Sequence, residues 1–208
     1  VGVGWNEEEV AALGQNFRDR GRRCDEWLRV MRALWSEDFA AFKGEFFEFE
    51  GIVSNPKPAQ PGGPPIMIGG QGEKKTLRMV AQYADESNLT GEVKDIPRKL
   101  EALAAHCERL GRDRSEIAVT KLLMIAVAPT QEEVEADLVE IAAVKGWNDN
   151  IMDMVRKVLI FGDADSVGEQ IAEAGGMGLD GVTVDLPVNG HNVERVALLG
   201  EIALKAMQ

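Results

Sequence analysis

A glycine-rich turn carries the clearest chemistry in this chain. A short apolar run at residues 66–68 is typical of a buried strand, and the sequence Gly69-Gly70-Gln71-Gly72 ends it. A helical pattern follows at once, with apolar residues on one face: Leu77, Val80, Ala81 and Ala84. Where a strand leads through a turn into a helix, free backbone N–H groups are exposed at the positive end of the helix. Phosphates bind at such positions.

The glycines alone leave two interpretations open. Three glycines in four residues let the main chain approach an anion closely, because no Cβ intervenes. Gly70-x-Gly72 lacks the third glycine of the dinucleotide fingerprint, and no Gly-Lys-Ser/Thr sequence completes a P-loop. From the residues themselves, a plain tight turn and an anion site are both compatible with this stretch.

The composition limits the class of protein. The 208 residues are 45% hydrophobic and 28% charged, which predicts one globular domain with a sizeable core. The formal net charge of −12 argues against nucleic acid and against an anionic membrane as partners, because either needs a basic face. It does not argue against a phosphate at the glycine turn, since charges more than about 8 Å away are largely screened at physiological salt.

The cysteines and the hydropathy pattern predict a compartment. No apolar run is long enough to span a bilayer, and no signal peptide is visible. Cys24 and Cys107 lie on apolar helix faces far apart in the sequence, which favours two buried thiols in a reducing cytosol over a disulfide. We therefore expect a cytoplasmic protein.

Strands and helices alternate along the chain. Strands are expected at residues 66–68, 85–91, 117–127 and 181–187. Helices are expected at residues 22–35, after the glycine turn to residue 84, at 96–110, after the capping box Thr130-Gln131-Glu132-Glu133, at 151–161, after Asp163 and at 192–207. This alternation predicts a parallel sheet with right-handed crossovers. An open doubly wound sheet fits, and so does the second half of a (β/α)₈ barrel, which needs about 250 residues.

Residues 39–65 interrupt the alternation. Aromatic residues around Gly44 and Gly51 predict a short hairpin: Phe42, Phe46, Phe47 and Phe49. The proline-rich stretch 56–65 predicts an extended connector, because it cannot be helical. Such a long excursion is usually a functional lid or rim, and a small satellite core is the alternative.

Several motifs, in order over almost the whole chain, resemble the bacterial luciferase-like family, in particular its deazaflavin-dependent oxidoreductase branch. They are Gly2-Val3-Gly4-Trp5, Arg18-x-x-Gly21-Arg22-Arg23-x-x-Glu26, Ala33-Leu34-Trp35, Phe42-x-Gly44-x-x-Phe47, Pro56-x-Pro58-x-Gln60-Pro61, Pro64-Pro65-Ile66-Met67-Ile68-Gly69-Gly70-x-Gly72, Tyr83-Ala84-Asp85-x-x-Asn88 and Gly111-Arg112-Asp113. The stretch from residue 56 to residue 88 is the specific part.

The resemblance implies a (β/α)₈ barrel of TIM-barrel type that binds a flavin or a 5-deazaflavin at its carboxyl-terminal end. On that fold residues 1–5 end the fourth strand, and the strands ending near Ile68, Asn88, Val127 and Leu186 are the fifth to the eighth. Residues 1–208 then form one luciferase-like domain whose N-terminal half is absent. Residues 39–65 resemble the family's insertion beside the site.

The resemblance also implies the cofactor contacts. Family members hold the cofactor phosphate on backbone N–H groups of the glycine turn, with a charge and a hydroxyl available one helical turn later. The next strand ends in polar residues that are candidates for the ring or the ribityl chain. The implied cofactor-binding residues are Ile68, Gly69, Gly70, Gln71, Gly72, Lys75, Thr76, Asn88 and Thr90. A solvent-facing lysine and a strand-terminating asparagine are the ordinary alternatives for Lys75 and Asn88.

No catalytic residue and no metal site are predicted. In this family the acid and base groups come largely from the first four strands. His106 reads as a surface residue of a helix, and His191 follows the last strand at the end where catalysis occurs, although an exposed loop histidine is the alternative. Glu86 and Asp185 flank the same end of the sheet.

Two classes of function remain. The first is an oxidoreductase that transfers hydride between coenzyme F-420 (8-hydroxy-5-deazaflavin) and a small organic substrate, with an FMN-dependent monooxygenase of the same family as its variant. The second is a truncated, non-catalytic module that dimerises through the edges an open half barrel exposes. A weaker alternative is an aldolase or isomerase with Lys121 as its Schiff-base lysine. We expect a homodimer.

Overall fold

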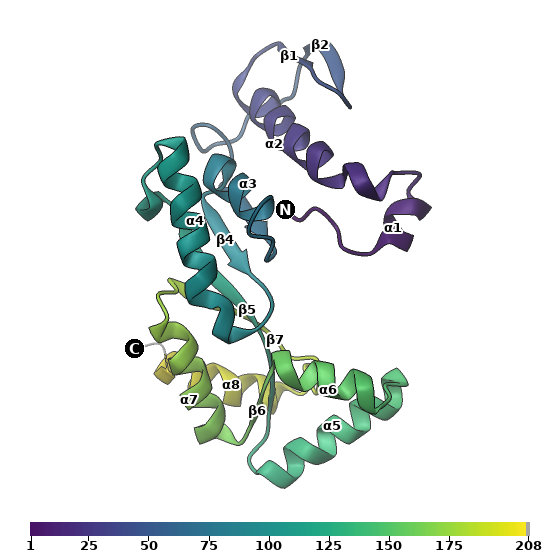
Figure 1. Ribbon diagram of the computed structural model, residues 1–208, viewed down its shortest axis with the longest axis vertical. Coiled ribbons are helices and arrows are strands. Elements are labelled where there is room, and N and C mark those ends of the chain that lie inside the picture. The colour runs from purple at the N-terminus through teal and green to yellow at the C-terminus, as the bar shows by residue number, and fades with distance from the viewer. Residues whose placement is uncertain (207–208) are drawn as a thin grey trace.

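A parallel sheet runs through the middle of the computed structural model, which describes residues 1–206 (Figure 1). Its strands are β3 (Met67–Gly69), β4 (Glu86–Leu89), β5 (Ala118–Val127), β6 (Leu159–Gly162) and β7 (Gly181–Asp185). The first half of β5 pairs with β4 on one edge and with β7 on the other, and its end pairs with β6. The strands β3, β4, β5 and β7 are neighbours in chain order and all parallel, as in a (β/α)₈ barrel, with the short β6 added at the end of β5, and the described strands form an open sheet.

Helices connect the strands. They are α1 (Glu7–Ala12), α2 (Arg20–Ser36), α3 (Thr76–Tyr83), α4 (Ile96–Leu110), α5 (Gln131–Lys145), α6 (Asp149–Val158), α7 (Ala164–Gly176) and α8 (Val193–Ala206). The bounds of α4 are those predicted, and Thr130 caps α5 as expected, because its Oγ1 accepts from the N–H of Glu133 at 3.3 Å. Among residues 1–206 no helix has the length and apolarity needed to cross a bilayer.

The prediction of a helix over residues 151–161 is wrong at its end. Helix α6 stops at Val158, and the next four residues form β6, which pairs with residues 124–127 of β5. The apolar face of α6 continues directly into Leu159, Ile160 and Phe161. Periodicity does not separate the last turn of a helix from a short buried strand when the apolar residues are continuous.

The two faces of the sheet differ in their cover. Ser87, Leu89, Val119 and Lys121 point toward α3 and α4 and are at most 1% exposed. The residues between them along the strands stay partly exposed on the other face, where Met67 is 38% exposed. Burying each large apolar side chain contributes about 1.5–3 kcal/mol, so α3 and α4 are held firmly on one face.

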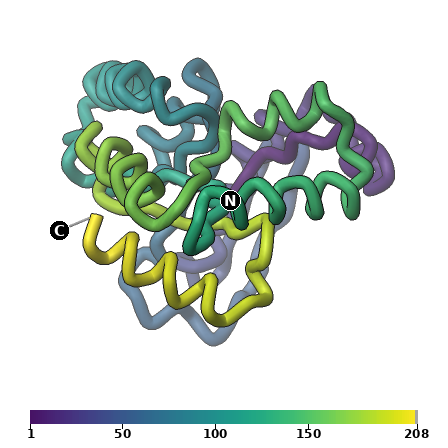
Figure 2. The backbone as a smooth tube through the Cα atoms, turned by 90° about the horizontal axis from the view of Figure 1, so that it is seen from below, coloured from purple at the N-terminus to yellow at the C-terminus, as the bar shows by residue number. Residues whose placement is uncertain are grey.

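The core falls into an N-terminal and a C-terminal part joined by β5 (Figure 1). The N-terminal part packs α2, α3 and α4 around β3 and β4, and it contains Cys24 and Cys107 as free, buried thiols, as predicted. Burial raises the pKa of both thiols. In the C-terminal part α7 packs against α8, while α5 and α6 project to the opposite side (Figure 2).

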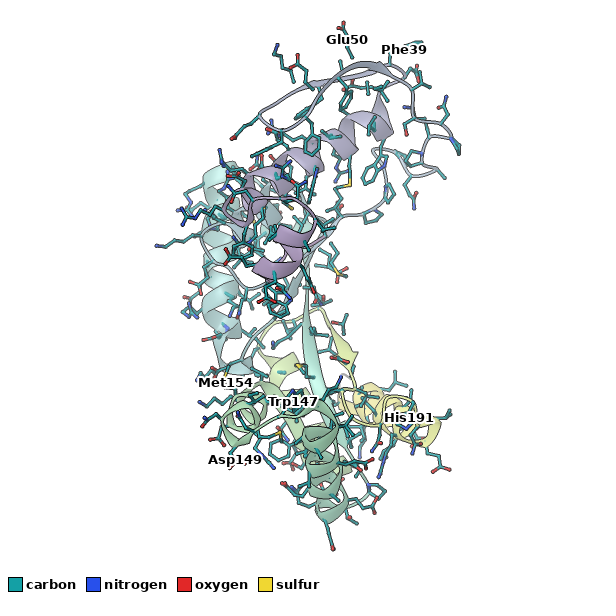
Figure 3. The ribbon with its side chains drawn as sticks, turned by 90° about the vertical axis from the view of Figure 1, so that its right-hand side faces the viewer. Phe39, Glu50, Trp147, Asp149, Met154 and His191 are labelled. Atoms are coloured by element: carbon teal, nitrogen blue, oxygen red, sulfur yellow. The ribbon has the colours of Figure 1, made fainter. Side chains whose placement is uncertain are left out.

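The predicted hairpin is present as β1 (Ala40–Lys43) and β2 (Glu48–Ile52), at the end of the molecule where Figure 3 labels Phe39 and Glu50. Its turn is bound by the buried carboxylate of Glu26 in α2, which accepts from the N–H groups of Glu45, Phe46 and Phe47 at 2.5, 2.9 and 3.2 Å. Burial raises the pKa of this carboxyl, but the three backbone donors outweigh it and the net pKa is lowered.

Candidate functional site

The backbone N–H groups of the glycine turn fall into two sets. Gly69 N–H donates to Val1 O at 2.9 Å and Gly70 N–H donates to Asn88 O at 3.0 Å, so both are used within the sheet. The N–H groups of residues 71–75 donate no hydrogen bond within residues 1–206. The free donors therefore begin at Gln71, two residues later than expected, and continue to the start of α3.

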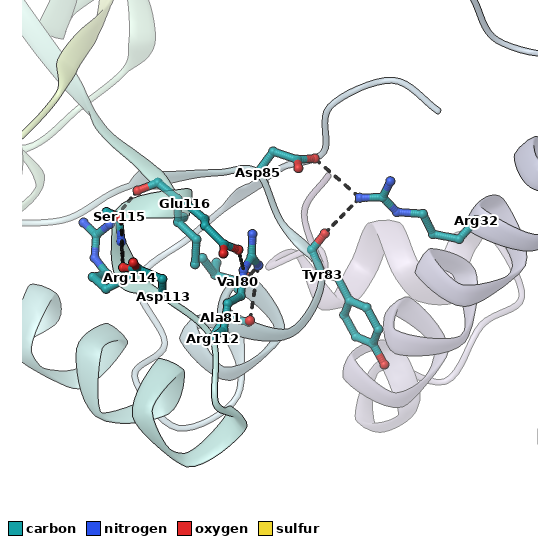
Figure 4. Close-up of polar contacts among 11 residues, drawn as sticks. Arg32, Val80, Ala81, Tyr83, Asp85, Arg112, Asp113, Arg114, Ser115 and Glu116 are labelled. Atoms are coloured by element: carbon teal, nitrogen blue, oxygen red, sulfur yellow. Dashed lines mark hydrogen bonds and ion pairs between the residues drawn. The ribbon is translucent and has the colours of Figure 1, made fainter. Parts of the chain in front are cut away.

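Helix α3 has its open end at this site. Its first residues carry no side-chain cap, with Lys75 at the N-cap position. Its other end is closed by two arginines (Figure 4): Arg112 Nη1 donates to Val80 O and Ala81 O at 3.4 and 3.2 Å, and Arg32 Nη2 donates to Tyr83 O at 3.3 Å. The negative end of the helix dipole is thus compensated, whereas the positive end faces the glycine turn.

Thr76 explains why glycine stands at positions 70 and 72. A Cβ on Gly72 would lie 2.9 Å from Thr76 Oγ1, and a Cβ on Gly70 would lie 3.2 Å from Thr76 Cγ2. Gly70 also has a φ of +136°, which side chains rarely adopt. The glycines let Thr76, which is 9% exposed, pack directly under the turn. The Thr76 hydroxyl forms no hydrogen bond among the described residues.

A cavity of about 520 Å³ opens beside the turn, and we call it the anion pocket. It is lined by Val3, Arg18, Arg20, Gly21, Gly72, Glu73, Lys74, Lys75, Thr76 and Met79. Arg18 lies in the short 3-10 turn Phe17–Asp19 and Arg20 is the first residue of α2, about fifty positions before the glycine turn. The sequence offered no signal that would bring these two arginines to the glycine turn.

The remaining predicted cofactor residues lie around the end of β4. Asn88 is on the partly exposed face, where its Nδ2 donates to Thr120 Oγ1 at 2.9 Å and to Thr183 Oγ1 at 3.0 Å. Thr120 Oγ1 in turn donates to Glu86 Oε1 at 2.7 Å. Thr90 follows directly after β4 and is partly exposed. This network across β4, β5 and β7 fixes the Asn88 side chain on the open face.

Ile68 has a different environment from the other predicted residues. Its side chain is fully buried in the core under α3 and α4, on the face away from Asn88. Ile68 is therefore not among the cofactor contacts that we propose.

The two histidines occupy separate places. His106 is half-buried, and its Nε2 lies 2.8 Å from Glu73 O, so its ring has a partner in the loop after the glycine turn. His191 is exposed and lines a cavity of about 550 Å³ next to α5 (Figure 3). That cavity shares no lining residue with the anion pocket.

Lys121 and Lys99 form a second, buried cationic cluster between β5 and α4. Lys121 is 1% exposed and its Nζ donates to Gly91 O at 2.6 Å, while the 3% exposed Lys99 lies 3.4 Å from Asp95 Oδ2. Burial and the charge of Lys99 lower the pKa of Lys121 to about 8, and Asp95 opposes this. Because Lys121 is enclosed and bonded to Gly91, its amine is not placed to meet a carbonyl substrate, which removes the support for a Schiff-base enzyme.

Comparison with known proteins gives the family. The sequence profile of the luciferase-like monooxygenases matches residues 1–181, and the chain belongs to this family. It is 34% identical over 113 residues to an uncharacterised protein of Mycobacterium tuberculosis H37Rv, covering 54% of this chain and 40% of that one. It is 29% identical over 151 residues to an FMNH₂-dependent dimethylsulfone monooxygenase of Pseudomonas putida, covering 67% of this chain and 39% of that one.

A solved structure shares the fold. An F420-dependent secondary alcohol dehydrogenase, in complex with an F420-acetone adduct, superposes on 100% of this chain and 68% of its own, with a TM-score of 0.82 and 18% identity. The fold is thus that of a luciferase-like (β/α)₈ barrel, of which β3, β4, β5 and β7 are neighbouring strands and the barrel is not closed. The chain spans about 40% of the length of the curated relatives described above.

Proposed function

We propose that this chain carries the cofactor-phosphate site of a flavin- or deazaflavin-dependent oxidoreductase. The observation that supports it most is the run of free N–H groups at residues 71–75, at the positive end of α3 and beside the anion pocket. A phosphate needs several convergent donors and little steric bulk, and Gly72 and the Thr76 hydroxyl supply both.

The chain's residues have distinct roles in this proposal. The amides of Gln71 and Gly72 and the hydroxyl of Thr76 bind the phosphate, and Lys75 adds a positive charge. Gly69 and Gly70 hold the turn on the sheet through their own hydrogen bonds. Asn88 and Thr90, at the end of β4, orient the ribityl chain or the ring.

The cofactor supplies the hydride chemistry when it is bound. We propose transfer of hydride between reduced coenzyme F-420 and a small organic substrate. An FMN-dependent monooxygenase is the variant favoured by the P. putida relative, whose name gives FMNH₂ as its cofactor. The site residues are the same in both, because they contact the phosphate and the chain attached to it.

Binding of the two cofactors tests the proposal. The chain is titrated with coenzyme F-420 and, separately, with FMN, using the fluorescence of each. We expect micromolar or tighter binding of at least one, and at least tenfold weaker binding by Gly72→Ala, whose Cβ would lie 2.9 Å from Thr76 Oγ1. Gly200→Ala in α8 is the matched control, since its Cβ would meet nothing within 4 Å. The absence of binding to either cofactor would contradict the proposal.

A non-catalytic, dimerising module is the second candidate. It is favoured by the partly exposed face of the open sheet, where Met67 is 38% exposed. Sedimentation velocity with and without cofactor discriminates the two: a stable dimer that binds no cofactor would favour the module, and cofactor binding would favour the oxidoreductase.

A further inference from the structure

Helix α4 contacts Glu73, in the loop between the glycine turn and α3, at two points. His106 Nε2 lies 2.8 Å from the main-chain oxygen of Glu73, and Arg98 forms an ion pair with the Glu73 carboxylate. Arg98 and His106 stand about two turns apart on α4, which packs beside α3 (Figure 1). Both the main chain and the side chain of Glu73 are therefore fixed from α4.

The two contacts of the His106 ring define its protonation state. A carbonyl oxygen only accepts hydrogen bonds, so His106 Nε2 carries the proton that is donated to Glu73 O. A guanidinium only donates, so His106 Nδ1, which lies 2.9 Å from Arg109 Nη2, is unprotonated and accepts. The ring is therefore neutral, with its proton directed at the loop.

The bond to Glu73 O sets the direction of the next N–H group. In a trans peptide the C=O and the N–H point in opposite directions, so an oxygen turned toward α4 leaves the Lys74 N–H turned away from α4. The preceding peptide is oriented by α3 instead, because Gly72 O accepts from the N–H of Leu77 at 3.0 Å.

The anion pocket lies on the side of this loop away from α4. Besides the loop, its lining comes from residues 3 and 18–21 and from α3, and within residues 1–206 none of it comes from α4. The Lys74 N–H donates no hydrogen bond in this part of the chain and is therefore free to serve the pocket. The ion pair with Arg98 draws the carboxylate of Glu73, an acidic residue in the lining, toward α4.

We propose that His106 is a positioning residue for the cofactor phosphate, which turns the Lys74 N–H into the anion pocket by donating to Glu73 O. This rests on the proposed function and adds the Lys74 amide to the donors named there. Arg98 supports the same arrangement, because it keeps a negative charge back from the phosphate. His106 does not touch the phosphate; it spares the ligand the cost of ordering the loop.

The tautomer of His106 is tested in the wild-type chain, without a variant. Side-chain ¹H–¹⁵N NMR at neutral pH distinguishes a proton on Nε2 from one on Nδ1, and the His106 signals are assigned by their loss in His106→Phe. We expect the neutral Nε2–H form. A neutral Nδ1–H form, or a doubly protonated ring, would overturn the proposal.

Two substitutions test the effect on the ligand. His106→Phe keeps a planar ring but removes the donor, so we expect FMN or coenzyme F-420 to bind about fivefold more weakly. The shift that the saturating ligand causes at the Lys74 amide should also shrink. His106→Gln, whose amide can donate to Glu73 O, should restore most of both. His191→Phe is the matched control, since its cavity shares no lining residue with the anion pocket.

The outcomes separate this proposal from the proposed function. An unchanged affinity and an unchanged Lys74 shift in His106→Phe, even with a lower free energy of unfolding, would make the contact purely structural. That result would overturn the role of His106 and leave the phosphate site standing. A loss that His106→Gln does not recover would assign the effect to ring packing and would also overturn it. No binding of either cofactor by the wild-type chain would overturn the proposed function together with the role of His106.

Discussion

The chain has two cationic clusters, and they have opposite surroundings. The anion pocket holds its arginines and lysines around an open cavity, without ion pairs among the described residues. The buried cluster holds Lys99 and Lys121 at 3% and 1% exposure, with Asp95 and the carbonyl of Gly91 as partners. In the first cluster Arg18, Lys74 and Lys75 are exposed, and within residues 1–206 only Arg20 is bonded, to the carbonyls of Gly4 and Phe17; the second cluster satisfies its charges internally.

The difference between the two clusters shows that the environment of a lysine decides whether its charge is free to bind a ligand. Desolvation disfavours the charged form of Lys121, so its charge costs the fold stability. The exposed lysines of the anion pocket carry no such cost. The glycine turn touches the surroundings of the buried cluster at Gly91, because the Gln71 side chain lies against Gly91 and Lys121 donates to its carbonyl.

Gly91→Ala should have a large effect on stability, because Gly91 has a left-handed backbone and the Gln71 side chain lies against it. Gly91 has a φ of +90°, and a Cβ there would lie 2.2 Å from Gln71 Oε1. We expect a loss of about 2–3 kcal/mol in the free energy of unfolding. Urea denaturation measures it, with Gly111→Ala as the control: φ is +65° there too, but a Cβ meets nothing within 4 Å. Equal losses in both variants would show that the contact with Gln71 contributes nothing.

Lys121→Met tests the cost of the buried charge through its pH dependence. The pKa in the folded chain is about 8, below the usual 10.5, so below pH 8 both states are protonated and the folded state carries the full penalty. Between about pH 8 and 10.5 the unfolded state binds more protons, so stability rises with pH, by up to about 3 kcal/mol.

The quantity to measure is the difference in the free energy of unfolding between the wild-type chain and Lys121→Met as a function of pH. Urea unfolding is followed from pH 7 to pH 10.5, and we expect the rise to be present in the wild-type chain and absent from Lys121→Met. Groups that titrate in this range and lie away from Lys121 affect both proteins equally. An identical pH profile in the variant would contradict the assignment of this penalty to Lys121.

Thr76→Val keeps the shape of the side chain but removes the hydroxyl from beneath the glycine turn. We expect about tenfold weaker binding of the cofactor phosphate, since a hydrogen bond to a charged acceptor contributes about 1.5–3 kcal/mol. Thr130→Val is the matched control. It removes the N-cap of α5 and about 1 kcal/mol of stability, with unchanged affinity. An affinity unchanged in Thr76→Val would remove the hydroxyl from the site.

The sequence predicted the elements that build this site better than the contacts within it. The helices followed from apolar periodicity, because burial of one face imposes that spacing, and the strand at residues 117–127 followed from an almost continuous apolar run. The glycine turn was also a local signal, because its three glycines separate an apolar run from a helical pattern. Its division into bonded and free amides was missed, because the pairing of Gly70 with Asn88 depends on where two separate strands stop.

Contacts between distant segments account for the rest. Arg18 and Arg20 reach the turn only through the packing of α2 beside α3, which no local pattern records. The sequence did not predict that Lys99 and Lys121 are buried together, because this depends on how α4 covers β5. The network among Glu86, Asn88, Thr120 and Thr183 likewise requires the register of three strands.

Lys74→Met should give the smallest change in stability. Lys74 is exposed and has no ion pair among residues 1–206, so we expect the free energy of unfolding to change by less than about 0.5 kcal/mol. The salt dependence of cofactor binding should become shallower, because one cation near the ligand is lost. Calorimetric titration at two salt concentrations measures this, and an unaltered salt dependence would place Lys74 outside the site.

The most direct test of the central claim is an amide ¹H–¹⁵N NMR titration of the chain with coenzyme F-420 and with FMN. The account predicts that the largest shifts fall on the amides of residues 71–75, with smaller shifts at Gly69 and Gly70, whose N–H groups already donate within the sheet. Shifts concentrated elsewhere, such as at the cavity beside His191, or no shifts with either cofactor, would contradict it.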